Sequence, residues 1–298
     1  MKITFNEEIA GALHFERPIV ALESTVISHG LPQPRNLDTA LRLEQIVRQA
    51  GAIPATIAMF GGEVFAGLSN EQLELLATAE NIRKLSRRDL AIAAAQKLNG
   101  ATTVATTALI AHAAGFNVFA TGGIGGVHRG FSADISADLP ELARTPIIVV
   151  CSGAKAILDL PATREWLETH GVAVLGWKTD KLPAFYSSTS DLDVDEPVET
   201  AAEVSQIADA RREMGLESAI IVAVPVPEES AIAQDEIETL IDDALAEATA
   251  QGVAGKSVTP FLLNELAQRS GGKTLAANIA LLENNARVGA EIAKALNY

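Results

Sequence analysis

Short apolar runs alternate with segments of helical periodicity along most of the chain, and no other feature constrains the fold as strongly. The apolar, strand-like runs lie at residues 18–22, 53–60, 117–120, 147–151, 172–176 and 219–226. Helical spacing of apolar residues marks segments between them, among them 36–49, 161–169 and 234–251. Strands that alternate with helices predict a mostly parallel sheet covered on both faces. We therefore expect an α/β fold of three layers, α/β/α, formed as a single domain by residues 1–298.

Composition narrows the class of protein. Hydrophobic residues make up 48% of the chain and charged residues 20%, which provides enough apolar side chain for a large core. A single cysteine, Cys151, excludes a disulfide framework and fits a reducing cytoplasm. We find no apolar segment of the length that a secretory signal or a membrane span needs. The sequence therefore predicts a cytoplasmic protein.

The net charge of −15 argues against a general surface for nucleic acid or for an anionic membrane. Its distribution is uneven, because residues 1–150 carry 12 basic and 14 acidic side chains and residues 151–298 carry 11 and 24. The nearly neutral first half is compatible with a small anionic ligand. It contains the cationic side chains Lys84, Arg87, Arg88, His128 and Arg129.

A stretch rich in glycine, TGGIGGVHRG at residues 121–130, directly follows an apolar run. Glycine is used where the backbone adopts positive φ or approaches a ligand closely, and the N–H groups of such a loop bind anions. Thr121 opens this glycine stretch, and His128 adds a cationic donor near its end. Asp134 and Asp138 follow with hard oxygen ligands for a metal. We interpret the glycine stretch as a site for a phosphorylated ligand, with a simple tight connection as the alternative.

The glycine stretch does not fit the dinucleotide fingerprint G-x-G-x-x-G. His128 occupies the position of the last glycine, and no helical pattern opens directly after it. A Rossmann site is therefore disfavoured.

Two reactive side chains follow other apolar runs. Glu23 comes directly after residues 18–22, and Lys155 follows residues 147–151 after three small residues. The carboxyl ends of parallel strands meet at one edge of a sheet, so we expect Glu23, the glycine stretch and Lys155 to converge there. Glu23 could instead cap a helix or pair with a cation, and Lys155 could extend to the surface. The functional interpretation of Lys155 is an amine nucleophile in a partly dry site.

Four further motifs carry weaker signals. Residues 83–89, RKLSRRD, are either a solvated loop or helix start, or a phosphate clamp that includes Lys84. Asn278 lies on an apolar helix face and is either a satisfied structural amide or a ligand contact. Residues 191–202 lack the glycine and the final acid of a calcium loop, and residues 250–257 lack the first glycine of a phosphate loop.

A set of longer motifs runs through nearly the whole chain. These motifs are ALEST at 21–25, SHG at 28–30, SRRDL at 86–90, the glycine stretch, DISADL at 134–139, GAK at 153–155 and TPFLL at 259–263, together with Asn278. In this order they are similar to the pseudouridine-5′-phosphate glycosidase family, which is indigoidine synthase A-like. The resemblance implies a single α/β/α catalytic domain, a homotrimer and Mn²⁺ as cofactor. It also implies reversible cleavage of pseudouridine 5′-phosphate to uracil and ribose 5-phosphate.

The resemblance assigns roles to individual residues. Lys155 would be the nucleophile, Glu23 the proton donor and Asp134 a ligand of Mn²⁺. The positions that match substrate contacts are Lys84, Val104, Ser136, Ala137 and Asp138, while Asn278 matches an active-site amide. Thr121 and His128 of the glycine stretch are further candidate substrate contacts. One departure is the segment 131–133, which is shorter than the family form and bears on the metal site.

The chemistry of a carbon–carbon glycosidic bond needs more than the two carboxylates that cleave O-glycosides. Opening of the ribose ring, with Glu23 protonating the ring oxygen, would place C1′ in conjugation with the uracil carbonyl. Lys155 would add to C1′ as a neutral amine, which burial and a neighbouring cation such as Lys84 would favour. Uracil would leave as a Schiff base forms, and water would release ribose 5-phosphate. The alternatives are a lyase acting on another sugar phosphate and a non-catalytic protein that binds a phosphometabolite.

Overall fold

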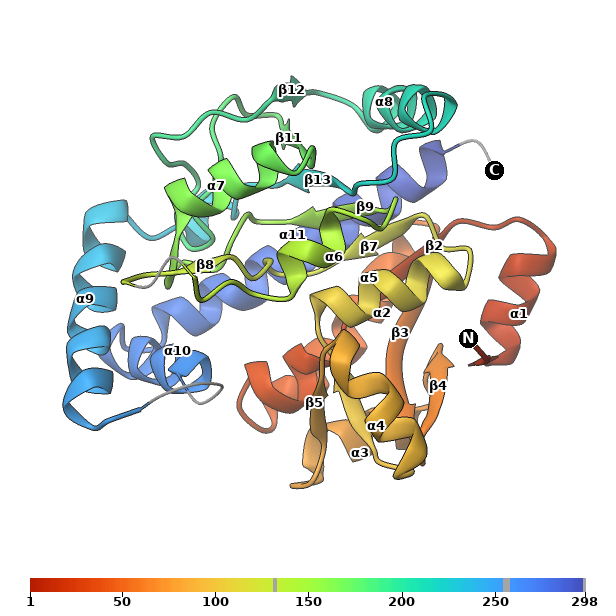
Figure 1. Ribbon diagram of the computed structural model, residues 1–298, viewed down its shortest axis with the longest axis horizontal. Coiled ribbons are helices and arrows are strands. Elements are labelled where there is room, and N and C mark those ends of the chain that lie inside the picture. The colour runs from red at the N-terminus through yellow and green to blue at the C-terminus, as the bar shows by residue number, and fades with distance from the viewer. Residues whose placement is uncertain (131–132, 254–257, 297–298) are drawn as a thin grey trace.

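The computed structural model describes residues 1–130, 133–253 and 258–296, and its centre is a mostly parallel sheet (Figure 1). Within this part of the chain the main strands follow one another in space in the order β1 (Ile3–Phe5), β4 (Glu63–Ala66), β3 (Ile53–Phe60), β2 (Ile19–Leu22), β7 (Val118–Ala120), β9 (Ile148–Cys151), β13 (Ile220–Ala223), β11 (Ala173–Trp177) and β12 (Glu196–Val198). Neighbours from β3 to β12 are parallel. The end of the sheet at β4 is mixed, because β4 is antiparallel to β3.

Short strands complete the sheet and brace the loops near its edge. β6 (Gly100–Thr102) is antiparallel to β3, and β5 (Arg83–Leu85) pairs with β6. A separate antiparallel pair joins β8 (Val127–His128) to β10 (Leu158–Asp159). The glycine stretch is thereby fastened to the segment that follows Lys155.

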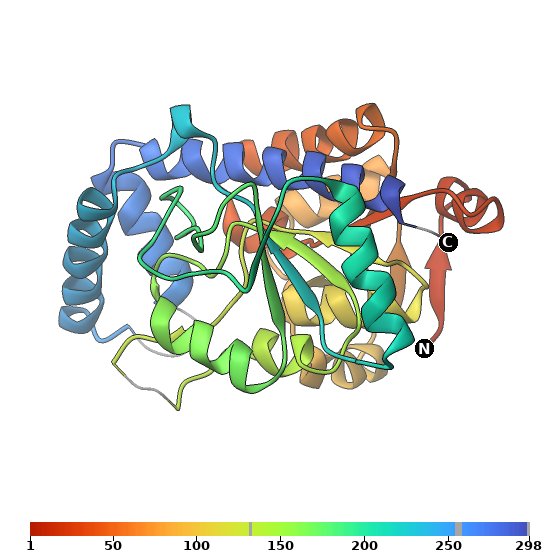
Figure 2. The ribbon, with the colours of Figure 1, turned by 90° about the horizontal axis from the view of Figure 1, so that it is seen from above.

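Helices cover both faces of the sheet (Figure 2). One layer contains α2 (Arg35–Gln49) and α11 (Lys273–Ala295), and the other contains α5 (Val104–Ala113), α6 (Asp138–Leu142) and α7 (Leu160–Thr169). The remaining helices are α1 (Glu7–His14), α3 (Asn70–Thr78), α4 (Leu90–Ala95), α8 (Ala201–Glu213), α9 (Gln234–Ala250) and α10 (Val258–Arg269). None of the described helices has the length and apolar character that crossing a membrane demands.

Local sequence signals explain where several helices begin. Ser69 and Gln72 form a capping box at the start of α3, and Thr200 and Glu203 form another at the start of α8. Asp159 caps α7, which has proline in its first turn. These caps satisfy N–H groups that have no acceptor within the helix.

The predicted α/β fold with three layers, α/β/α, is confirmed. The apolar runs at 18–22, 53–60 and 147–151 are the strands β2, β3 and β9, and residues 63–66 pair back on β3. The single catalytic domain over residues 1–298 stays a prediction. The segment 131–133 and the rejected phosphate-loop motif at 250–257 lie partly outside the described residues.

The differences concern short elements. Residues 83–89 are not a loop or helix start alone, since they begin with β5 and continue as a 3-10 turn at Arg87–Asp89. α5 starts at Val104, directly after Thr102 ends strand β6 and Thr103 caps the helix. A π-helical turn at Val26–Gly30 follows β2, and β1 and α1 were not predicted. Strands of three residues depend on pairing with distant partners, which local patterns do not report.

The sheet order places three chain segments side by side. Ala120 of β7 pairs with Leu22 of β2 on one side and with Val150 of β9 on the other. The residues after these strands, Glu23, Thr121 and the turn before Lys155, therefore leave the sheet at one edge. This convergence was the expectation from the sequence, and it positions the site.

Candidate active site

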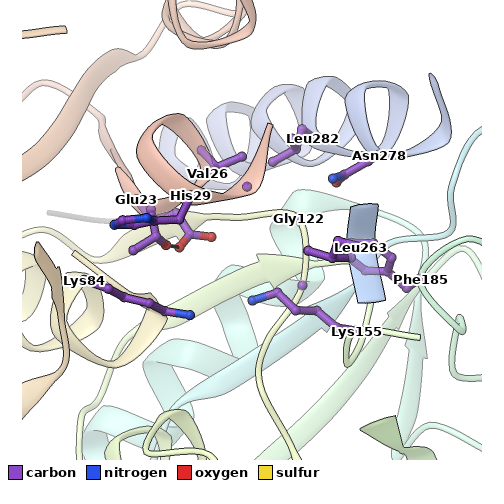
Figure 3. Close-up of a pocket in the computed structure, with 13 residues that line it drawn as sticks. Glu23, Val26, His29, Lys84, Gly122, Lys155, Phe185, Leu263, Asn278 and Leu282 are labelled. Atoms are coloured by element: carbon purple, nitrogen blue, oxygen red, sulfur yellow. Dashed lines mark hydrogen bonds between the residues drawn. The ribbon is translucent and has the colours of Figure 1, made fainter. Parts of the chain in front are cut away.

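A cavity with two arms opens at the carboxyl ends of β2, β7 and β9. Glu23, Thr25, Lys84 and Lys155 belong to the walls of both arms, so the arms meet at these four side chains. The inner arm, of about 60 Å³, is shown in Figure 3. The outer arm, of about 450 Å³, has the size of a pocket for a small molecule.

Glu23 follows β2 and is held by two threonines. Its side chain is 7% exposed, and its carboxylate accepts hydrogen bonds from the hydroxyls of Thr25 and Thr121. Thr25 belongs to the same loop, whereas Thr121 comes from the end of the adjacent strand β7. The hydrogen-bond partners of Glu23 are thus neutral hydroxyls. Its contacts match neither of the alternatives considered from the sequence, which were a helix cap and an ion pair with a cation.

Lys155 sits in a tight turn after β9 that is fastened to the glycine stretch. The backbone N–H of Ile124 donates to the carbonyl of Gly153 (3.1 Å), and the N–H of Lys155 donates to the carbonyl of Ile124 (3.0 Å). Gly153 has φ +81°, and a Cβ there would clash with the carbonyl oxygen of Pro183. The side chain of Lys155 extends into the cavity, so it does not simply extend to the outer surface (Figure 3).

Lys84, from β5, faces Lys155 across the cavity, and Figure 3 shows the two amine ends pointing toward each other. Withdrawal from solvent lowers the pKa of Lys84, and the positive charge of Lys155 lowers it further. Asp138 and Glu23 oppose this shift. The two amines are therefore an unfavourable pair when both are protonated.

The outer arm collects most of the predicted substrate contacts. Its walls include the predicted residues Val104, His128, Asp134, Ser136, Ala137 and Asp138. Asp138 joins two elements there, because its carboxylate accepts the N–H of Ala105 (2.9 Å), in the first turn of α5, and the N–H of Gly125 (2.8 Å). The same arm contains the exposed guanidinium of Arg88.

Two predicted residues lie elsewhere. Asn278, on α11, lines the inner arm together with Phe185 and Leu282. Thr121 is 2% exposed, and its hydroxyl contacts Glu23, so the structure places it behind the carboxylate. Its role as a direct substrate contact stays a prediction.

Two arginines considered as phosphate donors are already paired. Arg129 binds Glu238 (2.7 Å) and the carbonyl oxygens of Ala156 and Leu158. Arg87 binds the buried carboxylate of Glu141 (2.7 Å). These contacts fasten α9 and α6 to neighbouring segments, so the role of both arginines in the structure is architectural.

Most glycines of the stretch allow close packing of neighbouring side chains rather than a backbone with positive φ. Of the five, only Gly130 has positive φ, at +83°. A Cβ on Gly123 would lie 2.7 Å from the ring of Phe185, and a Cβ on Gly125 would overlap the hydroxyl of Ser136. Of the two uses of glycine considered from the sequence, positive φ applies only to Gly130, and the close approach at Gly123 and Gly125 is to protein side chains.

Several cavity residues were not assigned a role from the sequence. They are Thr25, His29, Phe185, Leu263 and Leu282. His29 follows β2 in the π-helical turn, where burial and the charge of Lys84 lower its pKa. Phe185 lies in an irregular loop with φ +62°, so no periodic pattern marks it.

The residues around Asp134 fit a weakly held, hydrated cation. Among the described residues, no group of three or more His, Cys, Asp or Glu side chains is arranged to hold a metal ion. Asp134 is exposed at the outer arm, whereas both oxygens of Asp138 already accept backbone N–H groups. One carboxylate plus water and phosphate oxygens is a common way to hold a hard divalent cation, so this donor set suits an ion that binds together with an anionic ligand.

Known proteins resemble this chain over nearly its full length. The sequence pattern of the family described as "Indigoidine synthase A like protein" matches residues 8–295. A pseudouridine-5′-phosphate glycosidase of Caldanaerobacter subterraneus is 52% identical over 297 residues, covering 99% of this chain and 97% of the relative. The protein of the same name from Escherichia coli is 50% identical, covering 98% of this chain and 95% of the relative.

A solved structure shares the whole fold. The crystal structure of the prealnumycin C-glycosynthase AlnA in complex with ribulose 5-phosphate superposes with a TM-score of 0.91 at 40% identity, covering 99% of this chain and 96% of that one. The chain belongs to the indigoidine synthase A-like family of enzymes, which confirms the resemblance seen in its motifs.

Proposed function

We propose that this enzyme is a pseudouridine-5′-phosphate glycosidase that reversibly cleaves the bond between C5 of uracil and C1′ of ribose 5-phosphate. The observation that carries the proposal is the placement of Lys155, Glu23 and Lys84 around one cavity at the edge of the sheet. Relatives about half identical to this chain bear that name. A related structure contains ribulose 5-phosphate, which supports a sugar phosphate as ligand.

The outer arm is the proposed site of the phosphate group. Lys84, Arg88 and His128 supply cationic groups, and Val104 lies at the N-terminus of α5, where the helix dipole favours an anion. Mn²⁺, held by Asp134 and by phosphate or sugar oxygens, would supply positive charge beside these oxygens. The inner arm, with Phe185, Leu282 and the amide of Asn278, would receive the uracil ring.

Glu23 is the proposed donor of a proton to the ring oxygen of ribose. A hydroxyl can donate to a carboxylate and can also accept from a carboxylic acid. Thr25 and Thr121 can therefore hold Glu23 in place before and after it gives up its proton. The ring opens as the bond between C1′ and the ring oxygen breaks with its electron pair left on the oxygen, which takes the proton of Glu23. The uracil ring supplies the electrons for a double bond between C1′ and C5 as its N1 releases a proton, and this proton returns to N1 when Lys155 adds to C1′.

Lys155 is the proposed nucleophile. It would attack C1′ as a neutral amine, and its amine end faces that of Lys84 across the cavity. The bond between C1′ and C5 then breaks with its electron pair left on uracil, and C5 takes up a proton. Water hydrolyses the resulting Schiff base, which releases ribose 5-phosphate and restores Lys155.

Uracil release from pseudouridine 5′-phosphate, measured with and without added Mn²⁺, tests the proposed function. We expect uracil from this substrate and much less from free pseudouridine, because the outer arm is matched to a phosphate. The first alternative is a lyase that acts on another sugar phosphate. Cleavage of uridine 5′-monophosphate faster than pseudouridine 5′-phosphate would support that alternative. The second alternative, a binding protein, predicts that ribose 5-phosphate binds while no substrate is cleaved.

The proposal includes the homotrimer that the resemblance implies and the cytoplasmic location that the composition predicts. Light scattering on the purified chain tests the first point. A molar mass near three times that of the 31.3 kDa chain is expected, and the mass of a single chain would contradict it.

A further inference from the structure

The side-chain amide of Asn285 lies between the segment that follows β7 and the segment that follows β9 and leads to Lys155. Asn285 is on α11 and is 0% exposed. Its amide nitrogen donates to the carbonyl oxygens of Thr121 (2.8 Å) and Gly122 (3.3 Å). It also exchanges hydrogen bonds with the hydroxyl of Ser152, at 3.1 and 3.3 Å. The amide therefore contacts the segment after β7 and the segment after β9 at the same time.

Each of these contacts leads directly to the cavity. The residue whose carbonyl Asn285 binds, Thr121, also holds the carboxylate of Glu23 through its hydroxyl. Ser152 begins the turn that carries Lys155, and its N–H donates to the carbonyl of Gly122 (2.9 Å). Asn285 itself does not line either arm of the cavity.

We propose that Asn285 is a positioning residue for the reaction and that it fixes the separation between Glu23 and Lys155. The inference rests on the proposed function, in which both side chains act on one sugar. A displacement of about 1 Å between reacting groups can cost a factor of about 10² in rate. A buried amide with partners on both strand ends restrains such a displacement, because breaking its contacts leaves buried polar groups unpaired.

The neighbouring Asn284 offers a matched control on the same helix. Its amide donates to the carbonyl of Pro225 (3.2 Å), and its oxygen accepts from Arg287 (2.8 Å). These contacts do not involve the segments after β7 or β9. Asn284→Asp therefore makes the same chemical change one residue away from the proposed contact.

The experiment compares steady-state kinetics and thermal unfolding of wild type, Asn285→Asp, Asn285→Ser and Asn284→Asp. For both Asn285 variants we expect kcat to fall by about 10²-fold, with KM within about threefold of wild type because the outer arm is untouched. We expect Asn284→Asp to keep wild-type kcat. Asn285→Ser introduces no buried charge, so it keeps the test valid if Asn285→Asp does not fold.

A purely structural role predicts a different pattern. It would lower the unfolding temperature while folded Asn285→Ser keeps the kcat of wild type, and that result would overturn the proposal. A tenfold or greater rise in KM with unchanged kcat would also overturn it. The wild-type enzyme serves as the reference. If it releases no uracil, the proposed function is refuted, whereas wild-type uracil release with unchanged kcat in Asn285→Ser refutes only the role of Asn285.

Discussion

At the scale of single residues, the contacts of Glu23 define what a substitution there would do. The carboxylate is nearly buried and bound only through hydroxyl donors in the described contacts, so an amide of the same shape can replace it without leaving an unpaired charge. The hydrogen bonds to Thr25 and Thr121 can therefore form whether or not the side chain at position 23 carries the proton that the proposed reaction transfers. This separation makes its catalytic role testable without unfolding the protein.

Glu23→Gln should fold with a melting temperature close to that of wild type but lose turnover by about 10²- to 10⁴-fold, the usual contribution of a general acid. Circular dichroism on heating and uracil release measure the two effects. Thr25 and Thr121 can donate to the amide oxygen and accept from the amide nitrogen. Near-wild-type turnover in a folded variant would refute the assignment of Glu23 as proton donor.

Lys84→Met should stabilise the free enzyme at neutral pH while weakening its affinity for substrate. The pKa of Lys84 is lowered, so its ammonium weakens the folded state at any pH below that pKa, by a small amount because the side chain is exposed to solvent. The penalty is relieved as pH rises through the folded-state pKa toward the ordinary lysine range. The gain in melting temperature over wild type should therefore shrink in alkaline buffer.

The kinetic half of this prediction is a rise in KM of about tenfold, because the outer arm loses a cation for the phosphate. Differential scanning fluorimetry across pH and steady-state kinetics measure both halves. A variant that is less stable than wild type at neutral pH would show that Lys84 makes favourable interactions that outweigh its repulsion by Lys155.

At the scale of elements, the glycine stretch packs against α6, α7 and α11 at once, with Gly126 lying against Thr163 of α7. Gly122 lies against Leu281 and Leu282 of α11, and Gly125 lies against Ser136 and Asp138. The stretch is therefore a junction between layers, and the N–H groups of Ile124, Gly125 and Val127 donate to acceptors within the protein. Its shape is set by neighbours that are distant in sequence.

Gly125→Ala should destabilise the fold by about 1–3 kcal/mol and raise KM, since the added methyl group overlaps Ser136 and disturbs the tie between Asp138 and α5. Gly11→Ala is a suitable control, because a Cβ at Gly11 of α1 meets no atom within 4 Å. That control should be neutral or slightly stabilising. Urea unfolding measures both; equal stability of the two variants would contradict the packing role of Gly125.

The sequence predicts elements best where they are long or uniformly apolar. Residues 147–151 indicate a buried strand, and Ser69 with Gln72 marks the start of α3, because both signals are local. The short strands β5 and β6 exist through pairing with each other and with β3, so their own residues carry no comparable signal. For the same reason the basic residues 83–89 look like a solvated segment when only the sequence is considered.

At the scale of the whole molecule, the order β2, β7, β9 in the sheet creates the site. Alternation of strands and helices predicted that Glu23, the glycine stretch and Lys155 would share one edge, and Ala120 indeed pairs with both Leu22 and Val150. The layer that closes the cavity was harder to foresee. Leu263 of α10 and Phe185 of an irregular loop reach it from far along the chain, and only their three-dimensional packing places them there.

Which charged side chains form ion pairs also depends on how distant segments pack in the folded chain. Arg129 follows the glycine stretch and resembles a phosphate donor in the sequence, yet Glu238 of α9 binds it. A carboxylate from the acidic second half of the chain thus neutralises this cation of the first half. Lys84, by contrast, has its pKa lowered by burial and by Lys155, as a group held within a functional cavity often has.

Covalent trapping tests the central claim, that Lys155 forms a Schiff base with the sugar. The enzyme is incubated with ribose 5-phosphate and borohydride, digested, and analysed by mass spectrometry, with Lys155→Ala as the matched control. We predict a reduced ribose 5-phosphate adduct on the peptide that contains Lys155 and no adduct in the control. An adduct on Lys84, or wild-type uracil release by Lys155→Ala, would contradict the account.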